Sequence, residues 1–243
     1  MQFAQQFPPI RLIDTYGLRT VSEADVLRAL AVKPGSDALQ TMTSQQDIIT
    51  RIKLLPNVAD ASLNLVCCDD AEGKSILFVG VREKGTPPLT FRPAPQGSVR
   101  LPAGILKAGE DFEQAFTKSI EAKEFTEDDS QGHALFTNKQ TRAVQERFLT
   151  LATPNLAILR RVIRESSDAK QRALAAQVIA YASDKRSVVD DLEYAMSDPD
   201  GDTRNNAMRA LLIIAKCANA NPQLKIKVPK LPFVRMLNSL EWT

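Results

Sequence analysis

Hydrophobic and polar residues alternate in three segments near the start of the chain, and this alternation predicts three β-strands. In residues 10–16 the alternation is weak and rests on Ile10 and Leu12. It is regular in residues 61–67, where Leu63 and Leu65 share a face, and in residues 76–81. We expect an acidic turn at residues 69–73 to join the last two strands as a hairpin.

Two segments between the first and second strands have the spacing of amphipathic helices. The first follows Ser22, which has Asp25 three residues later, and the second follows Ser44, which has Asp47 three residues later; both are helix-start signals. Pro56 sets the end of the second helix near residue 55. The order strand, helix, helix, strand, strand predicts a small α+β domain with both helices on one face of a sheet.

Three phrases carry a resemblance to a known family: IRLIDTYGLRTVSEADVLRALAVKPGSDA, DIITRIKLLPNVADASLNL and ILFVGVRE. Residues 1–84 resemble a POTRA domain, and Glu83 sits where that pattern places an acidic residue. The resemblance implies an extracytoplasmic, non-enzymatic module that binds proteins by strand addition at a sheet edge. Residues 61–68 or 76–82 are the expected edge, and whether the rest of the chain covers it stays open.

Residues 85–102 contain five prolines, which predicts an extended connector in place of a helix or a regular strand. The apolar residues within it lead us to expect that it packs along a surface. Beyond it, helical spacing predicts helices over residues 103–125 and 138–151. If the two modules dock, Phe91, Leu101 and Phe112 are the expected contacts.

The last third of the chain contains an internal repeat with an offset of 32 residues. Arg172 aligns with Arg204, and the alanines and branched aliphatics that follow them align as well. Each arginine follows an acidic turn, at residues 165–168 and 198–202, and each turn follows another apolar helix. The repeats are clearest over residues 154–218, and a further repeat is expected over residues 232–243, cut short at Trp242-Thr243.

The phrase DPDGDTRNNAMRAL resembles the acidic turn and Ala-rich second helix of HEAT repeats. The resemblance implies an all-α helical-repeat domain over residues 103–243 that follows the α+β domain. It also implies that the turn residues are structural and bridge neighbouring repeats. That role is carried over to Asp168, Arg172, Asp198, Asp202 and Arg204.

Composition and charge argue against several classes of protein. The chain has 243 residues, with 31 basic and 29 acidic side chains interspersed, so no basic stripe indicates a nucleic-acid partner. No apolar run is long enough to predict a membrane span. Three cysteines cannot all pair, so a disulfide framework is not expected, and Cys67, Cys68 and Cys217 are interpreted as free thiols.

An acidic segment is the only cluster that suggests chemistry, and it holds Glu127, Asp128, Asp129 and the single histidine, His133. One histidine excludes metal sites that need two imidazoles, and the spacing of a calcium loop is absent. We therefore expect a solvated turn in which an Asp or Ser caps the next segment. No catalytic, cofactor-binding or metal-ligating residue is predicted.

Our leading hypothesis is a non-enzymatic protein-binding scaffold at the bacterial cell envelope, with an unidentified protein partner. On the resemblance to POTRA domains, we expect a signal peptide to have been removed from a longer, periplasmic or otherwise extracytoplasmic parent. A cytosolic adaptor of the HEAT type is a second hypothesis. A third is an enzyme like the bilin lyases, which would draw on Asp128, Asp129, His133 and Tyr181.

Overall fold

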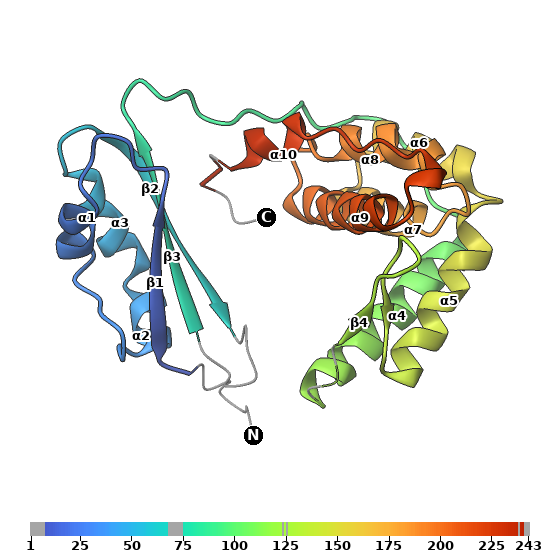
Figure 1. The fold of residues 1–243 in the computed structure, drawn as a ribbon, viewed down its shortest axis with the longest axis horizontal. Helices are drawn as coiled ribbons and strands as arrows, with labels where there is room; N and C mark the ends of the chain where they lie inside the picture. The colour runs from blue at the N-terminus through green and yellow to red at the C-terminus, as the bar shows by residue number, and fades with distance from the viewer. Residues whose placement is uncertain (1–7, 68–74, 123, 125, 238, 241–243) are drawn as a thin grey trace. The chain divides into compact units, whose positions relative to one another are not determined.

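The chain is a mixed α+β protein, as predicted, in a computed structural model that describes residues 8–67, 75–122, 124, 126–237 and 239–240 (Figure 1). It divides into two compact units, Met1–Thr90 with Val234–Trp242, and Phe91–Phe233. The expected turn at residues 69–73, Cys68 and the Trp242-Thr243 end lie outside the described residues. No described helix is long and apolar enough to cross a membrane.

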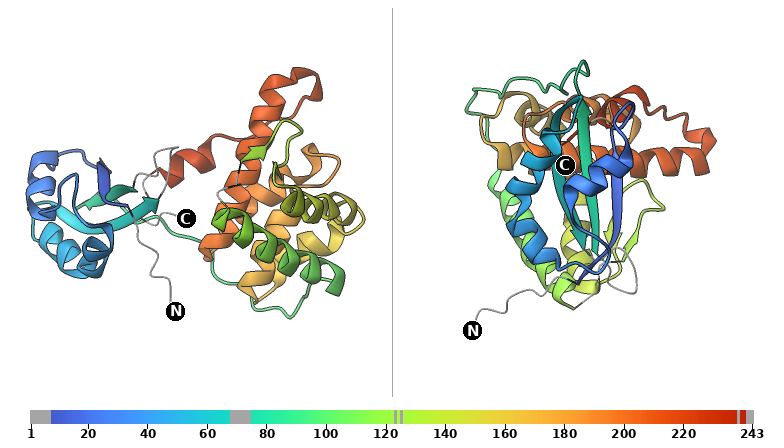
Figure 2. Two further views of the ribbon diagram at one scale, coloured as in Figure 1. Left: turned by 90° about the horizontal axis from the view of Figure 1, so that it is seen from below. Right: turned by 90° about the vertical axis from the view of Figure 1, so that its left-hand side faces the viewer.

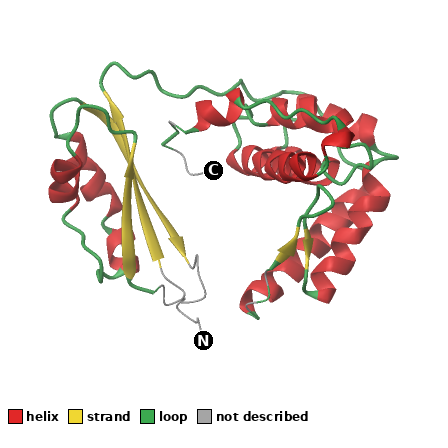
Figure 3. Ribbon diagram, in the orientation of Figure 1, coloured by secondary structure: helices red, strands yellow, loops and turns green. Residues whose placement is uncertain are grey.

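The first unit has the predicted strand and helix order with one helix added (Figure 3). Helices begin after Ser22 and Ser44 as predicted, although neither serine side chain makes a capping hydrogen bond. The added helix is capped by Asp37, whose side chain accepts from the Gln40 amide. The elements are β1 (Ile10–Tyr16), α1 (Glu23–Leu30), α2 (Ala38–Thr43), α3 (Gln45–Lys53), β2 (Val58–Cys67) and β3 (Ser75–Glu83).

The three strands form one sheet in the order β1-β3-β2. β1 runs parallel to β3, and β2 runs antiparallel to it. The prediction that residues 76–82 offer a sheet edge is therefore wrong, because β3 is paired on both sides. The alternation expected in β1 is also broken, since the register shifts between Ile10 and Leu12, so Ile10 is buried while Leu12 is 52% exposed.

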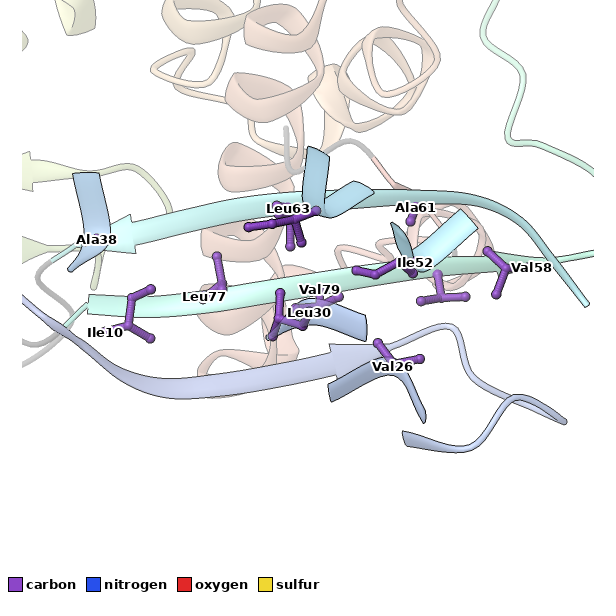
Figure 4. Packing of buried hydrophobic residues seen from close by; sticks show 12 residues of the cluster. Ile10, Val26, Leu30, Ala38, Ile52, Val58, Ala61, Leu63, Leu77 and Val79 are labelled. Atoms are coloured by element: carbon purple, nitrogen blue, oxygen red, sulfur yellow. The ribbon is translucent and has the colours of Figure 1, made fainter. Parts of the chain in front are cut away.

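Helices α1, α2 and α3 cover one face of this sheet (Figures 1 and 2). Buried aliphatic side chains fill the layer between helices and sheet, as Figure 4 shows for Leu30, Ile52, Leu63 and Val79. Burial of each such side chain contributes about 2 kcal/mol. β1 ends at Gly17, whose φ is +83° and where a Cβ atom would lie 2.1 Å from the Val81 carbonyl oxygen, so only glycine fits this turn.

Glu83, at the end of β3, ties the segment after Gly17 to the sheet. Its Oε1 accepts hydrogen bonds from the amides of Arg19, Thr20 and Val21, at 2.6, 2.8 and 2.9 Å. Its Oε2 accepts from the Thr20 hydroxyl at 2.6 Å. These donors, the Thr20 hydroxyl first, lower the pKa of the carboxyl to about 2.

The second unit consists mainly of packed helical pairs. α4 packs on α5, α6 on α7 and α8 on α9, and α7 packs on both α5 and α9. The predicted helices are therefore present. Their bounds, with those of the short strands, are α4 (Ala103–Glu121), β4 (Glu127–Asp128), β5 (Leu135–Phe136), α5 (Lys139–Ala152), α6 (Leu156–Glu165), α7 (Ala169–Ile179), η1 (Arg186–Val188), α8 (Val189–Ala195), α9 (Gly201–Ala220) and η2 (Pro222–Leu224); α10 (Leu231–Met236) follows, where a further repeat was expected.

Glu83→Gln should destabilise the first unit at neutral pH, because the neutral amide accepts more weakly and presents an NH₂ group to three amide donors. The depressed pKa of Glu83 gives the wild-type chain stability that is complete above pH about 4.3, the value in an unfolded chain, and is lost as pH falls towards 2. Urea unfolding followed between pH 7 and 2 should show a shallower pH dependence for the variant. Parallel curves for both proteins would contradict this role.

Candidate functional site

The turns before α7 and α9 repeat the same hydrogen bonds at an offset of 32 residues. Asp168 accepts from the amide three residues later at 3.2 Å, and Asp200 does the same at 2.9 Å, so both cap their helices. Nη1 of Arg172 donates to the Ser166 carbonyl at 2.9 Å, and Nη1 of Arg204 donates to the Asp198 carbonyl at 2.8 Å. Each turn is thus closed by an arginine from the helix that follows it.

Arg172 and Asp198 join one helical pair to the next. Nε of Arg172 donates to Oδ2 of Asp198 and Nη2 donates to Oδ1, both at 2.9 Å. The two side chains are 2% and 0% exposed. Asp198 also accepts from the Asp200 amide at 2.9 Å and from Nη2 of Arg92. A buried bidentate pair of this kind holds its geometry because both partners have lost their water.

The other predicted turn residues occupy different places. Asp202 lies exposed in the first turn of α9 and does not cap it; the cap is Asp200, which the N-cap spacing of the sequence could have indicated. Arg92 was also missed, and no local pattern identifies it, since it lies 106 residues from Asp198 along the chain. The sequence therefore shows the repeat, but it does not indicate that Arg92 also bonds to Asp198.

Residues 91–101, here called the strap, lie along these turns. The Arg92 amide donates to the Ser197 carbonyl at 2.9 Å, and the Ser167 amide donates to the Gly97 carbonyl at 2.8 Å. A Cβ atom at Gly97 would lie 2.4 Å from the Glu165 carbonyl oxygen, so a side chain would push the strap off the turn. The expectation that the proline-rich connector packs along a surface is confirmed for this part.

The residues expected to contact the other module pack inside the second unit. Leu101 is buried, and its amide donates to the Gln171 side chain at 2.7 Å. The Phe91 ring lies 3.7 Å from the Arg204 guanidinium, a cation–π contact. Phe112 packs against the rings of Phe116, Phe136 and Phe148.

The outer edge of β2 is partly closed by side chains. Asp60 accepts from the Ala61 amide at 3.0 Å, and Nε2 of Gln45 donates to the Leu63 carbonyl at 3.0 Å. Residues two apart in a strand direct their backbone groups to the same side, so the Leu63 and Leu65 amides face this edge too. In the described part of the chain these two amides have no partner. β1 is the other edge strand. The outer side of its first residue is already paired, because the Ile10 amide donates to the Ser36 carbonyl and the Ile10 carbonyl accepts from the Gly35 amide.

The acidic segment is a short hairpin with a buried second half, so the expectation of a solvated turn is wrong. Strands β4 and β5 pair antiparallel, with Glu127 opposite Phe136. Gly132 to Phe136 are buried, because these residues lie against aromatic and aliphatic side chains of the surrounding helices. The cap of α5 is Asn138, outside the acidic residues.

A pocket of about 260 Å³ lies between this hairpin and helices α4, α5, α7 and α9. One part of its wall is aromatic, from Phe112, Phe116 and Phe136. The other part is polar, from Glu127, His133, Gln145, Gln177, Tyr181, Asn205, Asn206 and Arg209. Small-molecule sites combine apolar side chains with convergent polar groups, and this pocket has both, although polar residues make up more of its wall than is usual.

Tyr181 and Gln145 form the fully bonded part of the polar wall. The Tyr181 hydroxyl donates to the Ala134 carbonyl at 2.8 Å and accepts from Nε2 of Gln145 at 3.1 Å. Oε1 of Gln145 accepts from the Phe136 amide at 2.6 Å. Burial raises the pKa of Tyr181 well above its usual value, so this hydroxyl stays protonated and fixes the hairpin to α5 and α7.

Glu127 and His133 form the part of the polar wall in which buried polar atoms lack hydrogen bonds of normal geometry to the described residues. Oε2 of Glu127 pairs with Arg209, but the buried Oε1 has no hydrogen-bond partner among the described residues. His133 is 7% exposed, and neither ring nitrogen makes a hydrogen bond of normal geometry, although the nearby Gln131 backbone favours the protonated ring. Burial dominates: it raises the pKa of Glu127 and lowers the pKa of His133 to about 4.

The remaining candidates of this segment are engaged elsewhere. Asp128 accepts from the Ser130 amide, and Asp129 pairs with Lys216 at 2.8 Å. The structure therefore brings His133 and Tyr181 together, with ring centroids 5.4 Å apart, and adds Glu127, but leaves Asp128 and Asp129 in other contacts. Among the described residues no group of carboxylate, thiol and imidazole side chains is arranged to hold a metal ion.

Cys217 is a buried free thiol, as predicted.

Comparisons with protein-family models, curated proteins and solved structures give no match to the chain.

Replacing Arg172 by Ala should destabilise the second unit by about 3–5 kcal/mol, because the Asp198 carboxylate would stay buried without its bidentate partner. Arg161→Ala is the matched control, since Arg161 pairs with Glu165 at the surface and its loss should cost less than about 0.5 kcal/mol. Equal unfolding free energies for the two variants in denaturant titrations would show that the Arg172–Asp198 pair does not hold the helical pairs together.

His133 is the only histidine of the chain, so its imidazole signals in NMR spectra are unambiguous. Its pKa should be about 4, against about 6.5 for an exposed imidazole. Because the unfolded chain binds a proton at this residue first, the stability of the second unit should decrease as pH falls from 6.5 to 4. A titration midpoint near 6.5 would place the ring in water and contradict its burial.

Proposed function

We propose that this chain is a non-enzymatic protein-binding scaffold of the bacterial cell envelope, which captures an extended segment of a partner protein along β2. The observation that supports this most directly is that the Leu63 and Leu65 amides, on the outer edge of that strand, have no partner among the residues that the structure describes. An extended peptide laid beside β2 would accept from both amides and extend the sheet by one strand. Backbone bonds of this kind supply affinity, and the neighbouring side chains supply selectivity.

The side chains on this edge limit where a partner strand can lie. Asp60 and Gln45 already occupy the Ala61 amide and the Leu63 carbonyl, so a partner would pair with the later part of β2, from Leu63 onwards. Short open edges of this type resist indiscriminate aggregation. The proposed partner segment is therefore short.

The resemblance of residues 1–84 to POTRA domains supports the envelope location, since such modules bind proteins outside the cytoplasm. The resemblance of the helical pairs to HEAT repeats suggests a second protein-binding surface on the helical unit. The buried Arg172–Asp198 pair would keep that surface rigid. The bilin-lyase alternative gains no support, because Asp128 and Asp129 are engaged away from Tyr181.

Amide hydrogen exchange tests the proposed edge at single residues. In the free protein the Leu63 and Leu65 amides should exchange much faster than those of Ser62 and Asn64, which face β3. A partner isolated from envelope extract with the intact chain as bait should protect the two fast amides on binding. Protection confined to other parts of the chain would contradict strand addition at β2.

A proline variant separates edge pairing from other modes of binding. Leu65→Pro removes one outward amide but no ladder bond to β3, so the fold should persist while affinity for the partner falls about tenfold or more. Arg28→Ala, at an exposed position on α1, is the control and should bind as the wild type does. Circular dichroism identifies a variant that has lost its fold, and unchanged affinity of a folded Leu65→Pro protein would refute the proposal.

A further inference from the structure

The pocket of the helical unit lies outside the proposed scaffold function, and two of the side chains that line it have buried polar atoms with no hydrogen-bond partner in the described part of the chain. Glu127 has one bonded and one unbonded carboxylate oxygen, and the unbonded Oε1 is buried. His133 is more than nine-tenths buried, and neither ring nitrogen makes a hydrogen bond of normal geometry to a described residue, although the Gln131 backbone lies near the ring. Buried polar groups are bonded in nearly all native structures, so two such side chains lining one pocket indicate that something else completes them.

The charges around the pocket favour a cation. The ionisable side chains that line it, besides His133 and Tyr181, are Glu113, Glu127 and Arg209, two carboxylates against one guanidinium. Arg209 is half exposed and pairs with Oε2 of Glu127. Asp129 and Lys216 act on Glu127 with opposite signs and pair with each other, so they do not compensate its buried charge.

The aromatic wall favours the same kind of ligand. The Phe112 and Phe116 rings are stacked with centroids 5.8 Å apart, and the Phe116 and Phe136 centroids are 5.2 Å apart. The faces of aromatic rings attract ammonium groups, most strongly where water is excluded. A cavity of about 150 Å³ holds benzene, so a pocket of about 260 Å³ has room for one ring with a short charged substituent.

We propose that this pocket binds a small organic cation, an ammonium group on an apolar body of about one ring, with its N–H groups directed to the Glu127 carboxylate and its body against the three phenylalanines. Tyr181 and Gln145 hold the wall in place through their own hydrogen bonds. His133 is uncharged above pH about 4, so it does not repel the cation and offers a further acceptor.

Three probes of nearly equal size separate charge from shape: benzylammonium, benzyl alcohol and benzoate. Binding to the full chain at pH 7 is followed through the ring signals of His133, which report on this pocket alone, and by calorimetry. Benzylammonium should bind about tenfold or more tightly than benzyl alcohol, because its bond to the carboxylate is charge-assisted. Benzoate should bind more weakly than either.

Glu127→Gln tests the residue that would select the cation. The variant keeps an oxygen at this position but loses the charge, so the preference for benzylammonium over benzyl alcohol should fall about tenfold. Glu146→Gln is the matched control, since Glu146 is exposed and pairs with Arg142. Its probe affinities should be those of the wild type. Chemical shifts of the remaining amides show whether each variant is folded.

Three results would overturn the proposal. The first is that none of the probes shifts the His133 signals at millimolar concentration. The second is that benzoate binds best, which would assign the pocket to anions through Arg209. The third is that a folded Glu127→Gln protein keeps the wild-type preference for the ammonium probe. Phe116→Leu provides a second variant if Glu127→Gln does not fold, and it should weaken benzylammonium more than benzoate.

Discussion

The helical unit depends on one buried carboxylate, that of Asp198. A carboxylate without exposure to water is costly unless donors satisfy its lone pairs, and here four donors do so: two from Arg172, one from Arg92 and the amide of Asp200. The donors come from three parts of the unit, namely α7, the strap and the turn before α9. The requirement to satisfy one charge therefore ties together two helical pairs and an extended segment.

The sheet unit also contains a buried carboxylate, Glu83, whose hydrogen bonds hold separate segments together. Glu83 collects three backbone amides and one hydroxyl from the segment after Gly17, so the path from β1 to α1 is determined by an acidic residue at the end of β3. The packed aliphatic layer stabilises the sheet against the helices, but aliphatic contacts are not directional. The carboxylate supplies the direction, and the glycine at residue 17, with φ of +83°, allows the turn that brings the amides to it.

Local patterns predicted most elements, because alternation, helix-start residues and proline act within a few positions of the chain. They identified both helices that follow Ser22 and Ser44, the strands and the repeat between Arg172 and Arg204. They failed where contacts between residues far apart in the sequence determine the structure. The register shift after Ile10 depends on pairing with β3, the central place of β3 depends on a parallel crossover, and Arg92 reaches Asp198 from 106 residues away. His133 looked like part of a solvated turn because nothing local reveals that α4, α5, α7 and α9 enclose it.

A comparison of Glu127 with Asp198 and Glu83 supports a binding role for the pocket. Asp198 and Glu83 each have four donors, which shows that this fold satisfies its buried carboxylates where they are structural. Glu127 has one cationic partner at one oxygen and none at the other, and an aromatic wall faces it. An oxygen that no described residue bonds, on a carboxylate in the wall of a pocket with room for one ring, is the feature that distinguishes Glu127 from these two carboxylates.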